Sequence, residues 1–245
     1  RGSAWQRPRT GFTGWRHPTI GYAFFNDQKM IDRTFVSRRN VLALAFGAGL
    51  APAVLAQGTP EAPDAFIRRL SADLLDTIKK DKSLQSGDPA KVAALVDQRV
   101  MPHLNFQRMT ASAVGPGWRQ ANPEQQKRLQ EEFKTLLMRT YTGALRQANE
   151  LSIVVKPARA AADDKEVLVR SEIVGRGEPV QLDYRVERAA DAPMGWRIYN
   201  FNVMGIWLID NYRNQFAQEI NARGVDGLIT TLAERNQSNR KADGK

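Results

Sequence analysis

The chain contains no cysteine and only two histidines, His17 and His103, among its 245 residues. The absence of cysteine excludes disulfide scaffolds, thiolate zinc sites, iron–sulfur clusters and cysteine nucleophiles. Two histidines are also too few for a metal site built from several imidazole ligands. The apolar run at 41–56 has 16 residues and contains Pro52, which makes it too short for a membrane span of about 20 residues. The remaining composition, with 42% hydrophobic and 25% charged residues, is that of a globular protein.

The positive charge is concentrated near the start of the chain. In total there are 36 Lys and Arg against 26 Asp and Glu, a net charge of +10. Residues 1–56 hold eight of the basic residues and only two acids, so the rest of the chain carries 28 basic against 24 acidic residues, a net of +4. Basic and acidic side chains alternate there, as in Lys127, Arg128, Glu131 and Glu132. We therefore predict no nucleic-acid partner, because such a partner needs a basic face.

Residues 30–56 have the layout of a secretory signal peptide. A basic stretch that ends in Arg38 and Arg39 precedes the apolar run, and small residues close the run at Ala56. We predict cleavage after Ala56 and export from the cytoplasm, in preference to a membrane anchor. The arginine pair approximates a twin-arginine motif, and both the Sec and the Tat route stay open. Residues 1–29 are then an untranslated or disordered upstream segment, and 57–63 form a linker.

Hydrophobic periodicity predicts one domain over 64–236, followed by a polar tail at 237–245. Apolar residues at helical spacing predict helices at 64–81, from Pro89 to about 100, after Asn105, at 123–148, from 206 to Gly224 and beyond Gly224. Asn122 and Gln125 predict a capping box at the start of the helix at 123–148. Alternating residues predict strands at 151–156, 166–174, 180–188 and 196–203. The fold class is therefore α+β, with a twisted antiparallel sheet of about four strands packed with several helices.

Groups that could support catalysis are sparse. His103 is interpreted as a surface or capping residue, and the pair Asp163 and Asp164 as a solvated turn. A small-molecule enzyme stays open as an alternative, with Tyr141, Tyr184 or Asp183 as conceivable acid–base groups. The alternation along 180–186 places Asp183 on the solvated face, opposite Tyr184, which counts against it. No cofactor and no metal site are expected.

The apolar helix and strand faces have two interpretations, an ordinary core or the lining of a ligand cavity. The segment 203–209 favours a cavity, because it is apolar on all sides where a strand meets a helix. A concave sheet under helices can enclose an apolar ligand. The candidate lining residues are Leu95, Val100, Phe133, Leu137, Tyr141, Tyr184, Val203 and Ile206.

Several segments, taken together and in order over nearly all of 64–236, resemble one family. They are PHLNFQRMT at 102–110, WR at 118–119, PEQQKRL at 123–129, EF at 132–133 with residues up to Leu137, RTY at 139–141, LDYRV at 182–186, GWRIYN at 195–200, NYRNQF at 211–216 and GVDGLI at 224–229. The chain thus resembles the MlaC/toluene-tolerance family of periplasmic phospholipid-binding proteins.

The resemblance implies a lipid carrier rather than an enzyme. Such a carrier moves phospholipid between an outer-membrane lipoprotein complex and an inner-membrane ABC transporter complex, and so maintains outer-membrane lipid asymmetry. The implied fold is NTF2-like in outline and encloses an apolar cavity for the lipid tails. The segment 200–207 departs from the family pattern, which has an acidic residue before the glycine and a small polar residue at the position of Trp207.

Overall fold

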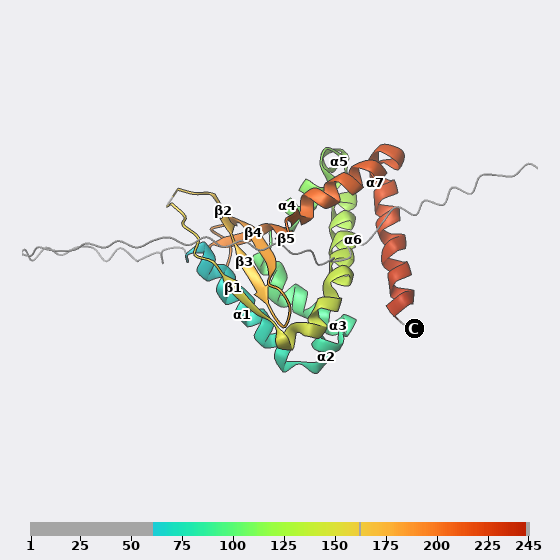
Figure 1. Ribbon diagram of the computed structural model, residues 1–245. Coiled ribbons are helices and arrows are strands. Elements are labelled where there is room, and N and C mark those ends of the chain that lie inside the picture. Colours follow the sequence, from blue (N-terminus) through green and yellow to red (C-terminus); the bar gives the residue numbers. More distant parts are fainter. Residues whose placement is uncertain (1–60, 162, 244–245) are drawn as a thin grey trace, which may run out of the picture. The chain divides into compact units, whose positions relative to one another are not determined.

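The computed structural model describes residues 61–161 and 163–243 (Figure 1). The upstream segment, the signal peptide, its cleavage after Ala56 and most of the linker lie outside these residues. No helix within the described ranges is long and apolar enough to cross a membrane.

The first half of the described chain is helical. Its α-helices are α1 (Pro63–Lys80), α2 (Lys82–Ser86), α3 (Pro89–Leu95), α4 (Phe106–Val114), α5 (Gly117–Gln120) and α6 (Pro123–Thr142). A π-helical turn (Val96–Val100) and a 3-10 turn (Met101–His103) join α3 to α4, and a 3-10 segment (Gly143–Glu150) follows α6.

Side-chain caps explain where these helices begin. Asn122 accepts a hydrogen bond from the backbone N–H of Gln125, whose side chain accepts one from the N–H of Asn122, so the predicted capping box is present. Asn105 caps α4 through the N–H of Arg108, as expected. The short helices α2 and α5 were not predicted, because four or five residues hold too few apolar positions to show a period. The α-helix predicted to reach residue 148 ends at Thr142.

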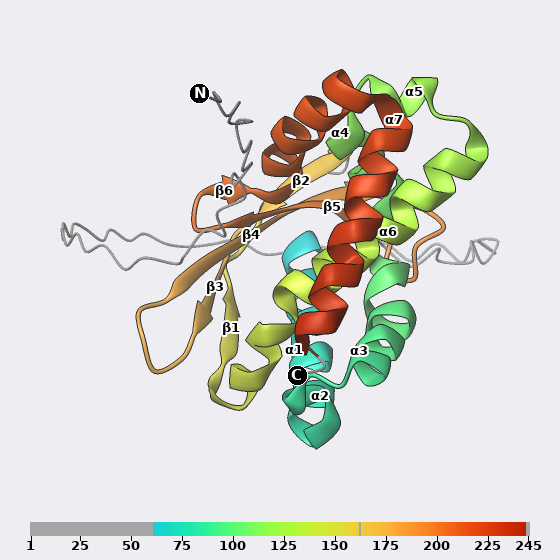
Figure 2. The ribbon, with the colours of Figure 1, turned by 90° about the vertical axis from the view of Figure 1, so that its right-hand side faces the viewer.

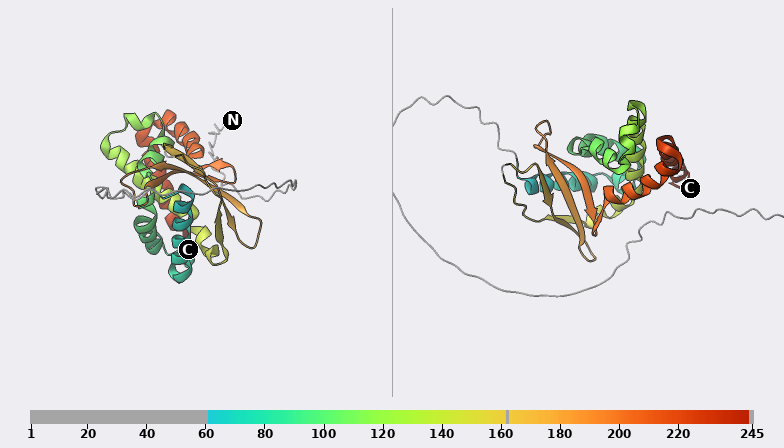
Figure 3. Two further views of the ribbon diagram at one scale, coloured as in Figure 1. Left: turned by 90° about the vertical axis from the view of Figure 1, so that its left-hand side faces the viewer. Right: turned by 90° about the horizontal axis from the view of Figure 1, so that it is seen from above.

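The second half forms an antiparallel sheet (Figure 2). Its strands are β1 (Ser152–Val155), β2 (Glu166–Val169), β3 (Ser171–Val174), β4 (Val180–Arg188), β5 (Trp196–Val203) and β6 (Ile206–Trp207). They are ordered β1-β3-β4-β5-β6, and β2 also pairs with β4. Six strands replace the four predicted, because Arg170 interrupts 166–174 and the chain forms a further hairpin after β5. Figure 3 shows β4 and β5 as the long adjacent strands of this sheet.

A β-bulge in β5 changes which side chains share a face. Arg185 lies opposite Asn200, but the next residue, Val186, lies opposite Ile198, so Tyr199 is an extra residue. The bulge lets Ile198 and Phe201, three positions apart, point to the same side of the sheet. Simple period-two alternation cannot predict this shift.

Asp183 corrects the expectation of a solvated face on β4. Its side chain is only 4% exposed. One carboxylate oxygen accepts a hydrogen bond from the backbone N–H of Ser171, and the other accepts one from the side-chain amide of Gln181. A buried carboxylate needs such donors, and here the neighbouring strand and its own strand supply them.

The last helix, α7 (Leu208–Asp243), consists of two helical parts that meet at Gly224, where φ is 69°. The predicted helix end at Gly224 is therefore confirmed, because glycine adopts positive φ without steric strain. The second part continues to Asp243, so residues 237–243 of the predicted tail are helical. It lies beside α6, where the Asn236 amide donates to the backbone oxygen of Glu132 at 3.0 Å (Figure 1). Ile206 lies in β6 rather than in a helix, contrary to expectation.

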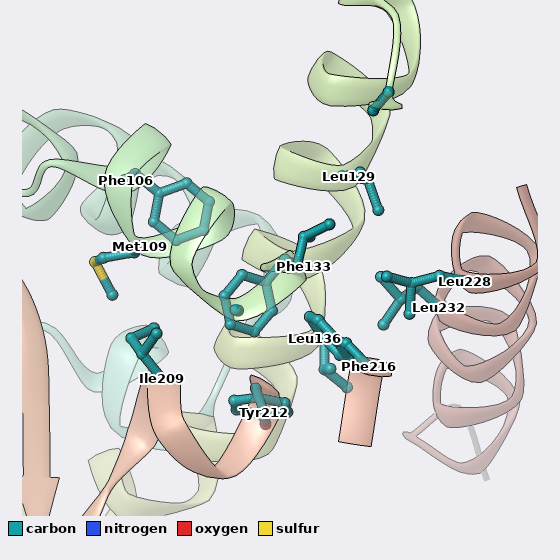
Figure 4. Packing of buried hydrophobic residues seen from close by; sticks show 13 residues of the cluster. Phe106, Met109, Leu129, Phe133, Leu136, Ile209, Tyr212, Phe216, Leu228 and Leu232 are labelled. Atoms are coloured by element: carbon teal, nitrogen blue, oxygen red, sulfur yellow. The ribbon is translucent and has the colours of Figure 1, made fainter. Parts of the chain in front are cut away.

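The buried apolar residues form three clusters. The helical cluster joins α4, α6 and α7 and centres on Phe133 (Figure 4). The sheet cluster packs Phe66, Ile67 and Leu70 of α1 against β1, β2, β4 and β5. The small cluster joins α1, α2, α3 and the 3-10 segment after α6; it comprises Ile78, Leu84, Val92, Leu95 and Ala148.

Candidate functional site

One face of the sheet carries apolar side chains that are only partly covered. Strand register places Leu182 opposite Val203, and Val203 opposite Ile206. Further along the sheet, Ile153 lies opposite Ile173, which lies opposite Val180. Alternation along β4 puts Val180 on the same side as Leu182. We call these six residues the open apolar face.

Burial decreases along this face toward the β5–β6 hairpin. Tyr184, two residues from Leu182 and on the same side, is buried under α1 as part of the sheet cluster. Leu182 and Val203 are half-buried, and Ile206 is 51% exposed. The described helices therefore cover one end of the apolar face and leave the other end partly open.

The second half of α6 adds partly covered apolar side chains. Leu137 is half-buried and packs against the helical cluster, which Phe201 of β5 and Leu208 of α7 also contact. Tyr141 follows Leu137 by one helical turn and is 44% exposed. Loss of solvation, together with nearby Tyr212, raises the pKa of Tyr141 to about 12. The raised pKa reflects surroundings that favour the neutral phenol over the charged form.

Other candidate lining residues lie within the packed core. Phe133 is fully buried, and its ring centroid lies 5.0 Å from that of Tyr212 and 5.3 Å from that of Phe216, both in edge-on contact (Figure 4). Leu95 is buried in the small cluster, and Val100 is half-buried in the π-helical turn. Tyr184 shares side-chain hydrogen bonds with Ser71 and Ser171, and burial raises its pKa.

The structure thus separates the eight candidates. Val203 and Ile206 lie together on the open apolar face, and Leu137 and Tyr141 share one side of α6. Phe133, Leu95 and Tyr184 belong to three different clusters. Contact of any of the eight with a ligand stays a prediction.

Sequence reasoning missed several residues of the open apolar face. Leu182, Ile173 and Ile153 occupy it but were not among the candidates. Their alternation with polar neighbours was visible in the sequence. What was missing was the strand register that brings them beside Val203.

The conceivable acid–base groups are not assembled into a pair. Asp183 and Tyr184 are consecutive in β4 and point to opposite faces, while Tyr141 lies on α6. His103 is half-buried beside Phe66, with ring centroids 5.9 Å apart, and burial followed by Arg69 lowers its pKa. Within 61–161 and 163–243 no three His, Asp or Glu residues gather where they could hold a metal ion. The chemistry that the open apolar face can offer is burial of apolar ligand surface, worth about 25 cal/mol per Å².

Two known proteins are similar to this chain over most of their length. The toluene tolerance protein ttg2D of Pseudomonas putida is 28% identical over 211 residues, which is 83% of this chain and 94% of that protein. The intermembrane phospholipid transport system binding protein MlaC of Haemophilus influenzae is 20% identical over 173 residues, 70% of this chain and 81% of that protein.

A solved structure is also similar to this chain. It is that of the phospholipid-binding protein from Ralstonia solanacearum in complex with a phospholipid. The two are 47% identical with a TM-score of 0.69, over 73% of this chain and 99% of the other. The model of the MlaC protein family matches residues 68–234, well over half of the sequence. This chain belongs to the MlaC family.

Proposed function

We propose that this protein is a phospholipid carrier. The acyl chains of the bound phospholipid lie against the open apolar face and the second half of α6. The observation that carries the proposal is the solved relative, 47% identical, which holds a phospholipid. The partly covered row formed by Leu182, Val203 and Ile206 supports it, because an acyl chain binds to an apolar surface that the protein itself leaves partly exposed.

We further propose that the protein acts in the periplasm, between two membrane complexes. The segment 30–56 would direct export to the periplasm, where cleavage after Ala56 would release the carrier. There it would move phospholipid between an outer-membrane lipoprotein complex and an inner-membrane ABC transporter complex. It would act by binding rather than by catalysis.

The energetics suit a carrier. Burial of each methylene is worth about 0.8 kcal/mol, in a bilayer as in a protein site. Because the membrane buries the same methylenes as the carrier, net transfer between the two is close to neutral. A carrier therefore needs an apolar site of the right size and no group that reacts with the lipid.

Solvent extraction of the purified protein, followed by mass spectrometry, tests binding directly. We expect about one phospholipid per protein. The absence of extractable phospholipid, together with no uptake from vesicles that contain labelled phospholipid, would refute the proposal.

Two substitutions locate the site. Val203→Arg and Leu137→Arg should abolish lipid binding while the domain stays folded, since half-buried positions let the guanidinium reach solvent. The matched control is Val154→Arg, because Val154 is 51% exposed in β1 and points away from the open apolar face. Wild-type lipid content in Val203→Arg, with circular dichroism unchanged, would contradict the placement of the acyl chains.

A further inference from the structure

A second concave site lies among the helices, separate from the open apolar face. The elements α4, α5 and the first part of α7 pack together (Figures 1 and 2) and form a pocket of about 420 Å³. The pocket is largely open to solvent rather than enclosed. None of the six residues of the open apolar face lines it.

Three arginines line this pocket: Arg108, Arg119 and Arg213. The remaining lining is Trp118, Pro116, Ser112 and small residues, and none of the described residues that line it is acidic. Three guanidinium groups in one pocket repel one another unless anions compensate them. The positions of the nearby carboxylates therefore decide what the pocket can bind.

Arg108 is already compensated. Its guanidinium forms ion pairs with Glu187 and, at 2.7 Å, with Glu166, and it lies 3.6 Å from the centre of the Tyr199 ring. The carboxylate of Asp210, one turn before Arg213 in α7, faces Arg185 at 3.9 Å. Glu166 and Glu187 thus compensate Arg108 alone, and Asp210 faces an arginine outside the pocket lining.

Arg119 and Arg213 keep free hydrogen-bond donors. The Nε–H of Arg213 donates to the backbone oxygen of Ser112 at 2.7 Å, which anchors the side chain and leaves its two terminal nitrogens available. Arg119 is exposed, and its side chain makes no ion pair or hydrogen bond within the described residues. Two positive charges with unused donors therefore face the same pocket.

From this charge balance we infer that the pocket binds a phosphate group, supplied either by the headgroup of an anionic lipid or by a soluble phosphate ester. The planar guanidinium group of arginine can donate two parallel hydrogen bonds to two oxygens of one phosphate. A phosphate offers more acceptor oxygens than one carboxylate, which suits two arginines better than an acidic side chain of a partner protein does. Trp118 and Pro116 provide an apolar wall for the glycerol carbons of such a ligand.

The test uses the full protein with glycerol 3-phosphate, and with vesicles of phosphatidylcholine containing phosphatidylglycerol. Binding of glycerol 3-phosphate is followed by the NMR shift of the Trp118 indole N–H, and vesicle binding by co-sedimentation. We expect saturable binding by at least one probe, weakened about tenfold or more by Arg119→Glu and by added salt. The matched control Arg159→Glu makes the same charge change at an exposed arginine outside the pocket and should bind as the wild type does.

The two probes distinguish the two sources of phosphate. Saturation by glycerol 3-phosphate supports a soluble ester, and binding confined to phosphatidylglycerol vesicles supports a lipid headgroup. The inference would be overturned if Arg119→Glu and Arg159→Glu weakened probe binding equally, or if neither probe bound to the wild-type protein. Equal binding of an acidic peptide without phosphate would overturn it in favour of a protein partner. Co-purified phospholipid, measured separately, reports on the proposed carrier function and does not depend on Arg119.

Discussion

His103 shows how burial can set the ionisation of one side chain. It ends the 3-10 turn before α4, half-buried against Phe66, and its Nδ1 atom is buried without a hydrogen-bond partner among the described residues. Burial and then the charge of Arg69 lower its pKa, while Asp73 acts in the opposite direction. The folded chain therefore holds this imidazole in its neutral form at pH values where the unfolded chain takes up a proton.

This difference predicts a pH dependence of stability. Above the unfolded pKa of 6.5 both states are neutral at His103 and the residue adds no pH dependence. As the pH falls below 6.5, the unfolded chain binds the proton first, so the free energy of unfolding falls until the pH reaches the lowered folded pKa. Urea titrations at several pH values should show that acidification lowers the free energy of unfolding less in His103→Gln than in the wild type. An identical loss in both proteins would assign the acid sensitivity to the carboxylates.

At the scale of elements, the β5–β6 hairpin combines a strained turn with exposed apolar residues. Met204 has φ of 52° and Gly205 has φ of 85°, the two positive values that a two-residue type I′ turn needs. Glycine adopts this conformation freely, whereas methionine does so at a cost of about 1–2 kcal/mol. Met204 is nevertheless 45% exposed, so packing does not account for the choice of methionine at the turn.

Replacing this methionine should relieve the strain. Asparagine tolerates the left-handed conformation and forms the favoured Asn-Gly turn. We expect Met204→Asn to raise the free energy of unfolding by about 0.5–1 kcal/mol, measured by denaturant titration. Ile206→Asn is the matched control, because Ile206 is similarly exposed but lacks a positive φ, and should give no gain. A Met204→Asn protein no more stable than the wild type would show that the turn is unstrained.

At the scale of the whole domain, the three clusters are joined by shared residues. Leu104 and Phe201 contact both the helical and the sheet clusters, and Leu74 contacts both the sheet and the small clusters. Because these contacts couple the clusters, loss of one exposes parts of the others. Residues 61–243 should therefore respond to a bound ligand as one unit.

Removal of the lipid should lower the stability of this unit. A ligand that binds only the folded state stabilises it, by about 2.7 kcal/mol when its free concentration is one hundred times Kd. We expect the thermal midpoint, measured by calorimetry, to fall after delipidation and to recover when phospholipid is restored. Val203→Arg should show the lower midpoint from the start and no recovery. A midpoint unaffected by verified delipidation would contradict tight, fold-coupled binding.

Local patterns predicted the elements well where they were long and had clear signals. The capping box at Asn122, the cap at Asn105 and the break at Gly224 were all predicted from nearby residues, because helix ends depend on neighbouring hydrogen-bond donors and on φ. The break at Arg170 and the bulge at Tyr199 were not predicted. Both depend on the register in which β2, β3 and β5 pair with β4, and the residues at each break do not specify that register by themselves.

The sequence alone determined the fold class, the capped helix ends and the family, because periodicity, caps and short motifs are local properties of the chain. The tertiary structure decided which apolar residues form the core and which stay partly open. Phe133 and Ile206 are both apolar, yet packing of α4, α6 and α7 buries the first and leaves the second half exposed. Pairing and burial join distant segments, so they likewise decided the buried state of Asp183 and the gathering of Arg108, Arg119 and Arg213 around one pocket.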